Sequence, residues 1–342
     1  MESRPVRVGV VGYGYWGPNL VRNLDRLPDA ELCAVCDASP AHRSRLRDAH
    51  PGVLGVADLD EMLATCGLEA VVIATPAPTH ASVATRVLEA GLHCYVEKPL
   101  TLSSADAEAL VELAAARDRV LMAGHLMIYH GAIEWIRDYL ASGDLGDVLY
   151  VYSQRLNLGK VRADENSFWS LAPHDISVVL DLLGEAPSSV SASGAAYLRD
   201  GIEDVVFATL RFPSGKMANI HVSWLDPHKV RRLTVVGTKK MLVFDDMEAT
   251  EKIWIYDKGV APTGALAYGE DLTLRFGDII APYVKMSEPL AAEMTHFLEC
   301  CRTGSWPRSD GASGLEVVRV LEAADTSIAG GGMPVTIERT SS

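Results

Sequence analysis

The sequence predicts an α/β protein with two domains: a doubly wound parallel sheet, followed by an α+β domain with an open, mostly antiparallel sheet. Two observations support this prediction. Residues 1–124 alternate short apolar runs with stretches of helical periodicity, which is the order of a parallel sheet covered on both faces. From about residue 147, strand-like segments follow one another with few helices between them, as in an antiparallel sheet. We therefore expect one domain at 1–124 and a second at 125–342.

Each expected element follows from its own stretch of sequence. The strands of the first domain are predicted at the apolar runs 6–12, 31–37, 70–76, 93–99 and 119–124. Those of the second domain are predicted at 147–155, 188–198, 203–212, 217–225, 229–237, 239–246 and 252–259. FPSGK and GTKK supply hairpin turns within this second sheet. Helices are predicted between the strands of the first domain, at 167–184, and at two closing segments, 289–302 and 313–329.

Composition and charge exclude several kinds of partner. A net charge of -14, with no block of basic residues, would repel a nucleic-acid backbone. No apolar run is long enough to span a bilayer and the N-terminus lacks the order of a signal peptide, so we expect a cytoplasmic protein. Cys33 and Cys36 form a C-x-x-C inside a strand-like run, and no second pair stands at zinc spacing. Free thiols and no metal site are therefore predicted.

A glycine-rich loop follows the first strand and precedes a helix. Gly12, Gly14 and Gly17 stand in G-x-G-x-x-G register, which lets the backbone approach a pyrophosphate at the positive end of that helix. Asp37 ends the second strand, where a carboxylate accepts hydrogen bonds from the adenosine ribose and repels a 2'-phosphate. NAD is therefore expected in preference to NADP, while the nearby Arg43 and Arg45 leave some use of NADP open.

Several motifs together resemble one oxidoreductase family. ATPAPTH (74–80) and VEKPL (96–100) are similar to the marks of the Gfo/Idh/MocA family, named for glucose-fructose oxidoreductase, inositol dehydrogenase and rhizopine catabolism. The resemblance covers essentially the whole chain and continues in GYGYWGPNLVRNL, GHLMIYH, RLNLGKVRADEN and APHDIS. It is strongest to a branch associated with nucleotide-sugar and secondary-metabolite sugar pathways. It implies a Rossmann domain, NAD(P) use and a small-molecule substrate, and it indicates the reaction type better than the ligand.

The resemblance also assigns roles to individual residues. Lys98 corresponds to the active-site lysine, which would hold a substrate hydroxyl and stabilise a developing alkoxide. His174 corresponds to the family's histidine, an acid/base for that hydroxyl. The alternatives are a lysine paired only with its neighbour Glu97 and a buried histidine with a satisfied partner. The expected cofactor site adds a set of residues from the same motifs: Tyr15, Trp16, Thr75, Pro76, His80 and Glu97.

The helix expected at 167–184 raises a question about its start. Proline is tolerated in a first helical turn, so Pro173 predicts that the helix begins there, directly beneath His174. Asp175 would then be stabilised in the first turn by the helix dipole. Ser170, which stands where the broader family commonly has an aspartate, would cap the helix or meet a substrate hydroxyl. Asp181 is either a buried partner or a solvated residue.

Other residues are candidates for substrate contact. His125 and Tyr129 follow the strand at 119–124 and either line the substrate site or pack between domains, and His130 is a weaker candidate. The remaining candidates lie on the segment leading to the 167–184 helix and at its head, and are Arg155, Asn157, Lys160, Arg162, Trp169, Ser170 and Asp175. A basic cluster in an acidic protein suggests a substrate phosphate, with a solvated loop as the alternative.

The expected function is an NAD-dependent dehydrogenase or ketoreductase that acts on a secondary hydroxyl or ketone of a sugar, nucleotide sugar or cyclitol. A glycosidase or epimerase that uses transient oxidation and a non-catalytic NAD-bound sensor are the alternatives. Because an open antiparallel sheet has a face to cover, and relatives pair through it, we expect a homodimer or homotetramer.

Overall fold

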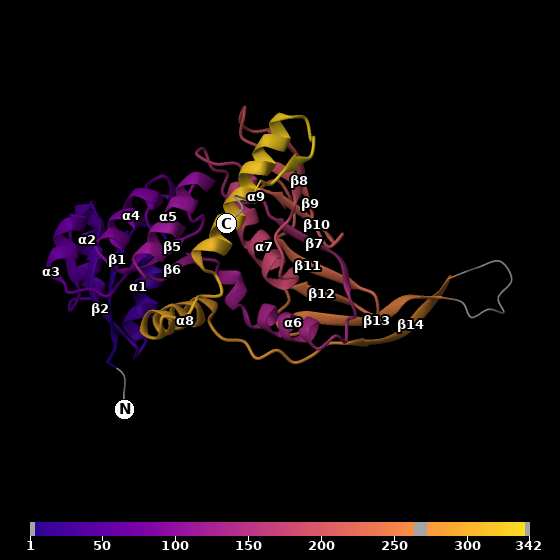
Figure 1. Ribbon diagram of the computed structural model, residues 1–342, viewed down its shortest axis with the longest axis horizontal. Helices are drawn as coiled ribbons and strands as arrows, with labels where there is room; N and C mark the ends of the chain where they lie inside the picture. Colours follow the sequence, from indigo (N-terminus) through magenta and orange to yellow (C-terminus); the bar gives the residue numbers. More distant parts are fainter. Residues whose placement is uncertain (1–3, 263–271, 339–342) are drawn as a thin grey trace. The chain divides into compact units, whose positions relative to one another are not determined.

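The computed structural model describes residues 4–262 and 272–338, which form two compact units (Figure 1). Unit 1 contains the chain up to Tyr129 together with Ser287–Arg319, and unit 2 contains His130–Met286 and the chain from Val320 onward. The expected division at 124/125 therefore differs from the structure, because 287–319 returns to the first unit. The reason is the apolar face of this segment: Leu290, Met294 and Phe297 are buried in the core of unit 1.

Unit 1 is built on a six-stranded parallel sheet with the order β3-β2-β1-β4-β5-β6. Its strands are β1 (Val6–Val11), β2 (Ala30–Cys36), β3 (Leu54–Val56), β4 (Ala70–Ile73), β5 (His93–Glu97) and β6 (Leu121–Gly124). Its helices are α1 (Gly17–Arg26), α2 (Pro40–Ala49), α3 (Leu59–Thr65), η1 (Ala77–Thr79), α4 (His80–Glu89), α5 (Ser104–Ala116), η2 (Leu126–Tyr129) and α8 (Pro289–Thr303). The Rossmann prediction is confirmed. The short strand β3 was not predicted, because its three residues carry no alternating pattern.

The order of the strands explains where a ligand site forms in unit 1. The chain winds outward from β1 to β3, then returns to the other side of β1 with β4, so the connections diverge between β1 and β4. In open parallel sheets this switch point lies beside the carboxyl ends of the strands, where ligands bind. The glycine loop, Asp37, Lys98 and His125 each directly follow one of these strands.

Unit 2 is built on a nine-stranded mixed sheet with the order β14-β13-β12-β11-β7-β10-β9-β8-β15. Its strands are β7 (Val148–Leu156), β8 (Ser189–Ala195), β9 (Val205–Arg211), β10 (Met217–Ser223), β11 (Val230–Gly237), β12 (Met241–Asp245), β13 (Ile253–Pro262), β14 (Leu272–Ile280) and β15 (Val335–Thr336). Only the central pair β7 and β10 is parallel among the pairs that the structure describes. The seven expected strands are present, and β14 and β15 are additional.

Two helices of unit 2 flank strand β7 in the sequence. α6 (Gly131–Ala141) precedes β7, and α7 (Ser167–Leu183) lies between β7 and β8 and contacts β7, β9 and β10. α9 (Gly311–Ala329) begins in unit 1 and ends in unit 2. No described helix is long and apolar enough to cross a membrane.

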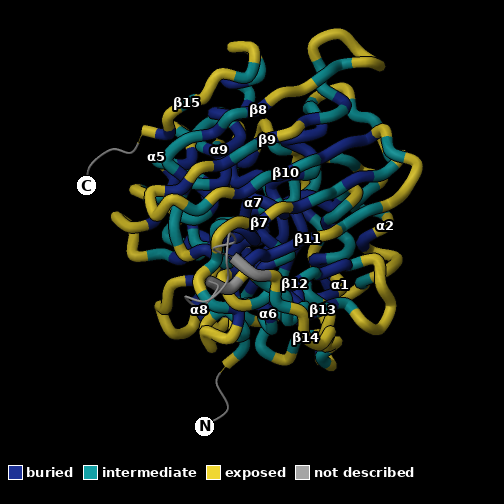
Figure 2. The backbone as a smooth tube through the Cα atoms, turned by 90° about the vertical axis from the view of Figure 1, so that its right-hand side faces the viewer, coloured by how far each residue is buried: buried dark blue, intermediate teal, exposed yellow. Residues whose placement is uncertain are grey.

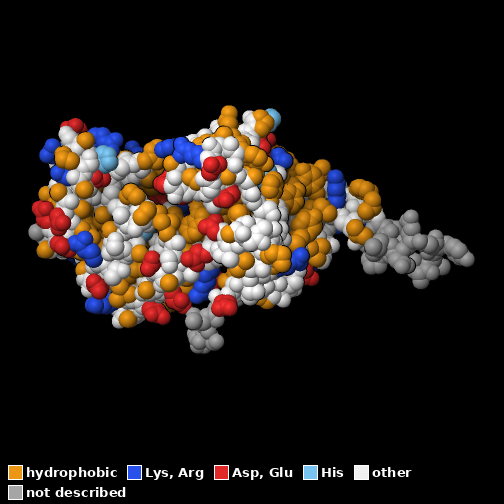
Figure 3. All heavy atoms as spheres, turned by 90° about the horizontal axis from the view of Figure 1, so that it is seen from above, with side chains coloured by type: hydrophobic (Ala, Val, Ile, Leu, Met, Phe, Trp, Pro, Cys, Tyr) orange, Lys and Arg blue, Asp and Glu red, His pale blue; other side chains and the backbone are white. Residues whose placement is uncertain are grey.

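The face of the sheet opposite α7 carries exposed apolar side chains. Figure 2 views the strands β7 to β12 from this side, and Figure 3 shows hydrophobic side chains gathered near the base of the β13–β14 hairpin. Tyr150, Tyr152, Phe207 and Met217 are each more than a third exposed on strands that pair with one another. Phe207 stacks on His221 at 4.1 Å between ring centroids. We call these five residues the open-face cluster.

Candidate functional site

The glycine loop between β1 and α1 has the shape that the fingerprint predicts. Gly12 has φ +100°, and a Cβ there would lie 2.6 Å from the carbonyl oxygen of Ala74, so only glycine fits. A Cβ at Gly17 would collide with the carbonyl of Gly12. At Gly14 the nearest atom would be His42 Cε1 at 3.9 Å, so the packing of the chain itself does not demand glycine there. The space above Gly14 therefore fits a close approach by a ligand.

Asp37 organises this loop from the end of β2. Its Oδ2 accepts hydrogen bonds from the backbone N–H of Tyr13 at 2.6 Å and contacts His42 Nδ1 at 3.0 Å, and its Oδ1 accepts from Ser39 N–H at 2.8 Å. Partial burial raises the pKa of Asp37, but these donors outweigh it and the pKa lies below its ordinary value. The carboxylate is therefore ionised at neutral pH and fixed in direction.

Two arginines lie beside Asp37 and serve the backbone of the same region. Arg43 Nη1 donates to the carbonyl of Asp37 at 2.6 Å, and Arg45 Nη2 donates to the carbonyl of Tyr13 at 3.1 Å. Both guanidinium groups and His42 thus stand around the expected ribose position. His42 was not predicted as a site residue, although its place five residues after Asp37 was a usable signal.

Lys98 follows β5 and sits among titratable groups. Its neighbour Glu97 accepts hydrogen bonds from Trp16 Nε1 at 2.6 Å and from Lys98 N–H at 3.2 Å. Burial raises the pKa of Glu97 to about 7, although the charge of Lys98 and these donors oppose the rise. Burial, with a smaller contribution from the charge of Lys98, lowers the pKa of His125 to about 4. His125 is therefore a neutral imidazole, and neither of its ring nitrogens has a hydrogen-bond partner in the described part of the chain.

The residues after β4 form a support for the Lys98 loop. His80 is buried, and its Nδ1 and Nε2 lie 2.8 Å from the carbonyl oxygen of Pro99 and 2.9 Å from that of Thr75. It thus joins the loops that follow β4 and β5, and burial lowers its pKa. Thr79 Oγ1 donates to Thr75 Oγ1 at 2.8 Å and lies 2.7 Å from the carbonyl of Pro76.

Three other candidates have contrasting surroundings. Tyr15, in the glycine loop, is 94% exposed, which leaves its ring available to a ligand. Tyr129 is fully buried, and its hydroxyl shares a hydrogen bond of 3.1 Å with Ser309, which supports the packing alternative over substrate contact. His130 accepts from Ala132 N–H at 3.2 Å and caps α6.

In unit 2, a helix is present where one was expected, at 167–184, but the prediction that Pro173 marks its start is wrong. α7 begins at Ser167, and Asn166 caps it by accepting from the N–H groups of Phe168 and Trp169 at 3.1 and 3.0 Å. Pro173 therefore lies inside the helix, where it cannot supply the N–H that the carbonyl of Trp169 would accept. His174 is beyond the first turn, and Ser170 is not the capping residue.

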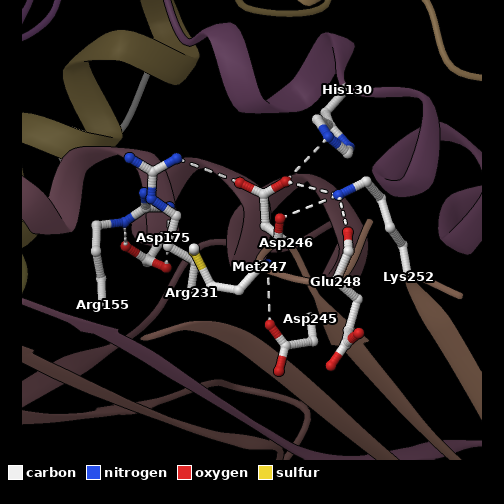
Figure 4. A network of polar contacts seen from close by, with 9 residues as sticks. All are labelled: His130, Arg155, Asp175, Arg231, Asp245, Asp246, Met247, Glu248 and Lys252. Carbon is white, nitrogen blue, oxygen red and sulfur yellow. Dashed lines mark hydrogen bonds and ion pairs between the residues drawn. The ribbon is translucent and has the colours of Figure 1, made fainter. Parts of the chain in front are cut away.

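The expected dipole role of Asp175 is also wrong. Asp175 is buried, and its Oδ2 pairs with Arg155 Nε on β7 at 2.5 Å (Figure 4). Ser153 Oγ donates to Oδ1 of the same carboxylate. The residue that follows His174 thus fastens α7 to the sheet. It also takes Arg155 out of the predicted basic cluster.

A second ionic group lies next to this pair (Figure 4). Arg231 stands directly opposite Arg155 on the adjacent strand, and its Nη1 lies 3.3 Å from Asp246 Oδ2. Asp246 also faces His130 Nε2 at 3.4 Å and Lys252 Nζ at 3.5 Å. Partial burial raises the pKa of Asp246, but its interactions with His130, Lys252 and Arg231 outweigh this and lower the pKa to about 2.

The side chains of some of the remaining predicted residues of unit 2 are held by hydrogen bonds or ion pairs, and those of others within the described ranges are not. Trp169 Nε1 donates to Asp325 Oδ2 at 2.6 Å, and Arg162 pairs with Glu165 at 2.9 Å. Asp325 was not predicted, because nothing in the sequence links it to a residue so far away. Asn157 Oδ1 is buried and has no hydrogen-bond partner among the described residues. Lys160 is exposed.

Several other expectations can be compared with the structure. Asp181 pairs with Arg137 of α6 at 2.8 Å, so it is a partner and not a solvated residue. The six cysteines are free thiols. No group of three or more His, Cys, Asp or Glu residues within the described ranges could hold a metal ion.

Comparison with known proteins agrees with the resemblance read from the motifs. Residues 6–125 match the model described as "Oxidoreductase family, NAD-binding Rossmann fold", and 133–243 match the GFO/IDH/MocA C-terminal domain. UDP-N-acetylglucosamine 3-dehydrogenase of Acidithiobacillus ferrooxidans is 30% identical over 93% of this chain and 95% of its own length. Its crystal structure aligns with a TM-score of 0.79 over 95% of this chain and 99% of that chain.

Two further proteins are similar to this chain over most of its length. Inositol 2-dehydrogenase of Rhizobium meliloti is 26% identical over 95% of this chain and 97% of its own length. A putative oxidoreductase of Magnetospirillum magnetotacticum is 34% identical in structural alignment, with a TM-score of 0.80 over 93% of this chain and 99% of that chain. The chain is an NAD-binding oxidoreductase of the Gfo/Idh/MocA family, whose relatives include dehydrogenases of sugars and cyclitols.

Proposed function

We propose that the protein is an NAD-dependent dehydrogenase or ketoreductase of a secondary hydroxyl or ketone on a sugar, with nucleotide sugars as the favoured class. The observation that carries this proposal is the group of residues after β5 and β6. Lys98, its neighbour Glu97 with a pKa raised to about 7, and a neutral His125 without a hydrogen-bond partner among the described residues lie at the edge of the sheet that also holds the glycine loop.

The residues of unit 1 fit the cofactor. The loop at Gly12 to Gly17 would bind the pyrophosphate. The packing of the chain would allow a side chain at Gly14, so the glycine there leaves space for a ligand, and no side chain caps the start of α1. Asp37 would face the ribose, and the remaining cofactor contacts would come from Tyr15, Trp16 and Thr75. The nicotinamide, when bound, supplies the hydride acceptor for oxidation or the donor for reduction.

Lys98 would act on the substrate oxygen. Its ammonium can donate to the reacting hydroxyl and offset the negative charge that develops as the C–H bond weakens. Glu97 accepts a hydrogen bond from the backbone N–H of Lys98, and its negative charge would offset the positive charge of the Lys98 side chain. The neutral imidazole of His125 offers either a donor or an acceptor to the ligand, since neither nitrogen is satisfied within the described chain.

His174 would move the proton of the reacting hydroxyl. An imidazole takes or returns a proton at neutral pH, and the buried pair of Asp175 with Arg155 holds the adjacent residue of α7 on the sheet. This anchoring limits the directions that His174 can take. Serine at 170 supplies no negative charge, so the proton transfer would depend on His174 and Lys98.

The preference for a nucleotide sugar is supported by the name of a relative and by residues of unit 2. The relative at 30% identity is named for UDP-N-acetylglucosamine, and the match covers nearly the whole of both chains. In unit 2, Lys160 is exposed, and the buried side-chain Oδ1 of Asn157 has no hydrogen-bond partner among the described residues. The ion pairs of Arg155 and Arg162 leave the predicted phosphate cluster with fewer free charges than the sequence suggested.

A reaction without net oxidation is the second candidate. Relatives from Escherichia coli and Mediterraneibacter gnavus, each 25% identical over less than three quarters of this chain, are named 2,7-anhydro-N-acetylneuraminate hydratase. Formation of NADH in step with the product supports the dehydrogenase, whereas a product formed without NADH supports a closed redox cycle.

The catalytic roles are tested by following NADH absorbance with a panel of nucleotide sugars, free sugars and cyclitols. His174→Ala should lower kcat by about 10²- to 10⁴-fold, the range for a positioned acid/base. Ser170→Ala is the matched control on the same helix and should cost less than about tenfold. Near-normal turnover by His174→Ala, with loss of turnover in Ser170→Ala, would remove the acid/base role from the histidine.

A further inference from the structure

A buried acidic residue lies in the core of unit 1 behind the Lys98 loop. Glu293 is on α8, three residues after Leu290 and four before Phe297, so it falls on the apolar face of the helix. Its side chain is fully buried, and neither carboxyl oxygen meets hydrogen-bond geometry with any described residue. An ionised carboxylate in such surroundings is strongly disfavoured.

The Tyr95 hydroxyl lies near both Glu293 and Glu97, the residue before Lys98. It lies 3.3 Å from Glu97 Oε1 and is also close enough to Glu293 for each group to alter the pKa of the other. The contact with Glu293 is looser than a full hydrogen bond. A Cβ at Gly124 would lie 2.6 Å from this hydroxyl, so the glycine at the end of β6 leaves it the space that it occupies.

The groups around Glu293 and Glu97 favour a negative charge on only one of these two carboxyl groups. Glu293 is faced by Tyr95 and Glu97 from β5 and by Tyr129 from η2, and Arg308 stacks over the Tyr129 ring at 5.0 Å. The other groups around Glu97 and Lys98 are the indole N–H of Trp16 and the neutral imidazole of His125. Burial, followed by the charge of Glu97, raises the pKa of Glu293 well above its ordinary value.

We propose that Glu293 is a positioning residue for Lys98: it remains a neutral carboxylic acid, so that the single hydroxyl hydrogen of Tyr95 is given to Glu97. An ionised Glu293 would compete for that hydrogen. With Glu293 neutral, Glu97 alone carries the negative charge beside Lys98. Its ionised form then accepts from Tyr95, Trp16 and the backbone of Lys98 together.

The link to catalysis rests on the proposed function, but the hydrogen-bond chain can be measured without turnover. Trp16 donates directly to Glu97, so the fluorescence difference between the unmodified protein and Trp16→Phe reports the titration of Glu97. The expected midpoint is about 7. Tyr95→Phe removes a donor to ionised Glu97 and should move this midpoint upward by about one pH unit, whereas Glu293→Leu removes a neutral group, leaves the Tyr95 donor in place and should keep the midpoint within about 0.3 pH unit. Each of these two variants is repeated with Trp16→Phe as its own reference.

Glu293→Gln keeps a neutral group of the same shape and should leave the midpoint within about 0.3 pH unit of that of the unmodified protein. Glu299→Gln, an exposed carboxyl on the same helix, is the matched control and should not move it. At a pH well above the Glu97 midpoint, the infrared carbonyl band of a protonated acid should still be present, and it should be lost in Glu293→Gln. With an active substrate, the pKa that governs the fall of kcat/KM at acidic pH should shift among these variants as the fluorescence midpoint does.

The proposal is overturned if Glu293→Gln lowers the midpoint by about one unit, which would mean that Glu293 is ionised. It is equally overturned if Tyr95→Phe does not move the midpoint, or if Glu293→Leu lowers it by about one unit. Absence of turnover on every sugar, with these spectroscopic shifts present, contradicts the proposed function and leaves the hydrogen-bond chain standing.

Discussion

Replacement of Asp175 by asparagine tests whether the pair in Figure 4 fastens α7 to the sheet. Arg155 and Asp175 have side chains that are 11% and 8% exposed, so the substitution leaves a guanidinium buried without its counter-charge. Breaking a buried pair on one side costs about 3–5 kcal/mol. For a unit of this size, that corresponds to a fall in Tm of roughly 6–20 °C.

The loss can be measured by urea unfolding followed by tryptophan fluorescence. Four of the six tryptophans, Trp135, Trp169, Trp224 and Trp254, belong to unit 2, so the signal reports that unit. Glu165→Gln is the matched control, because it breaks the pair with Arg162, whose side chain is 41% exposed. It should lower the free energy of unfolding by less than about 1 kcal/mol.

A double variant separates the missing charge from the missing contact. Arg155→Met with Asp175→Leu removes both charges and should recover most of the loss, because two buried charges can be replaced by apolar groups at little cost. If Asp175→Asn costs less than about 1 kcal/mol, the pair does not anchor the helix. If the double variant is as unstable as the single one, an unpaired charge is not the cause.

Three further predictions concern the cofactor, acid stability and assembly. Asp37 should make kcat/KM higher with NAD than with NADP, and Asp37→Ala should narrow the gap; better use of NADP by the unmodified protein would show that Arg43 and Arg45 dominate. The pKa of Asp246 is lowered from 3.8 to about 2, so its stabilisation is present above pH 3.8 and is lost as the pH falls towards 2. The difference in unfolding free energy between the unmodified protein and Asp246→Asn should therefore shrink over that interval, and a constant difference contradicts the pairing. The open-face cluster should be covered by a second copy, so light scattering at micromolar concentration should give a dimer or tetramer, and Phe207→Lys should shift the mass towards the monomer; a monomeric unmodified protein would refute this.

Much of the fold could be predicted because its signals are local. The periodicities of 2 and 3.6 residues separate the strands from the helices, and the glycines at 12, 14 and 17 shape their loop through contacts within a short stretch of chain. The hairpin turns at 212–216 and 237–240 were likewise found from their own residues. Strands β3 and β15 escaped prediction, because such short strands exist only through pairing with a neighbour.

The sequence by itself determined the Rossmann sheet, the glycine loop and the identity of the family motifs, since these depend on residues close together in the chain. Only the tertiary structure decided which partner each charged side chain takes. It moved the start of α7 from Pro173 to Ser167, paired Arg155 with Asp175, and placed Glu293 beside Tyr95. These contacts join residues far apart in sequence, and burial removes the solvent that would otherwise satisfy each group, so their partners are set by the packing of whole elements.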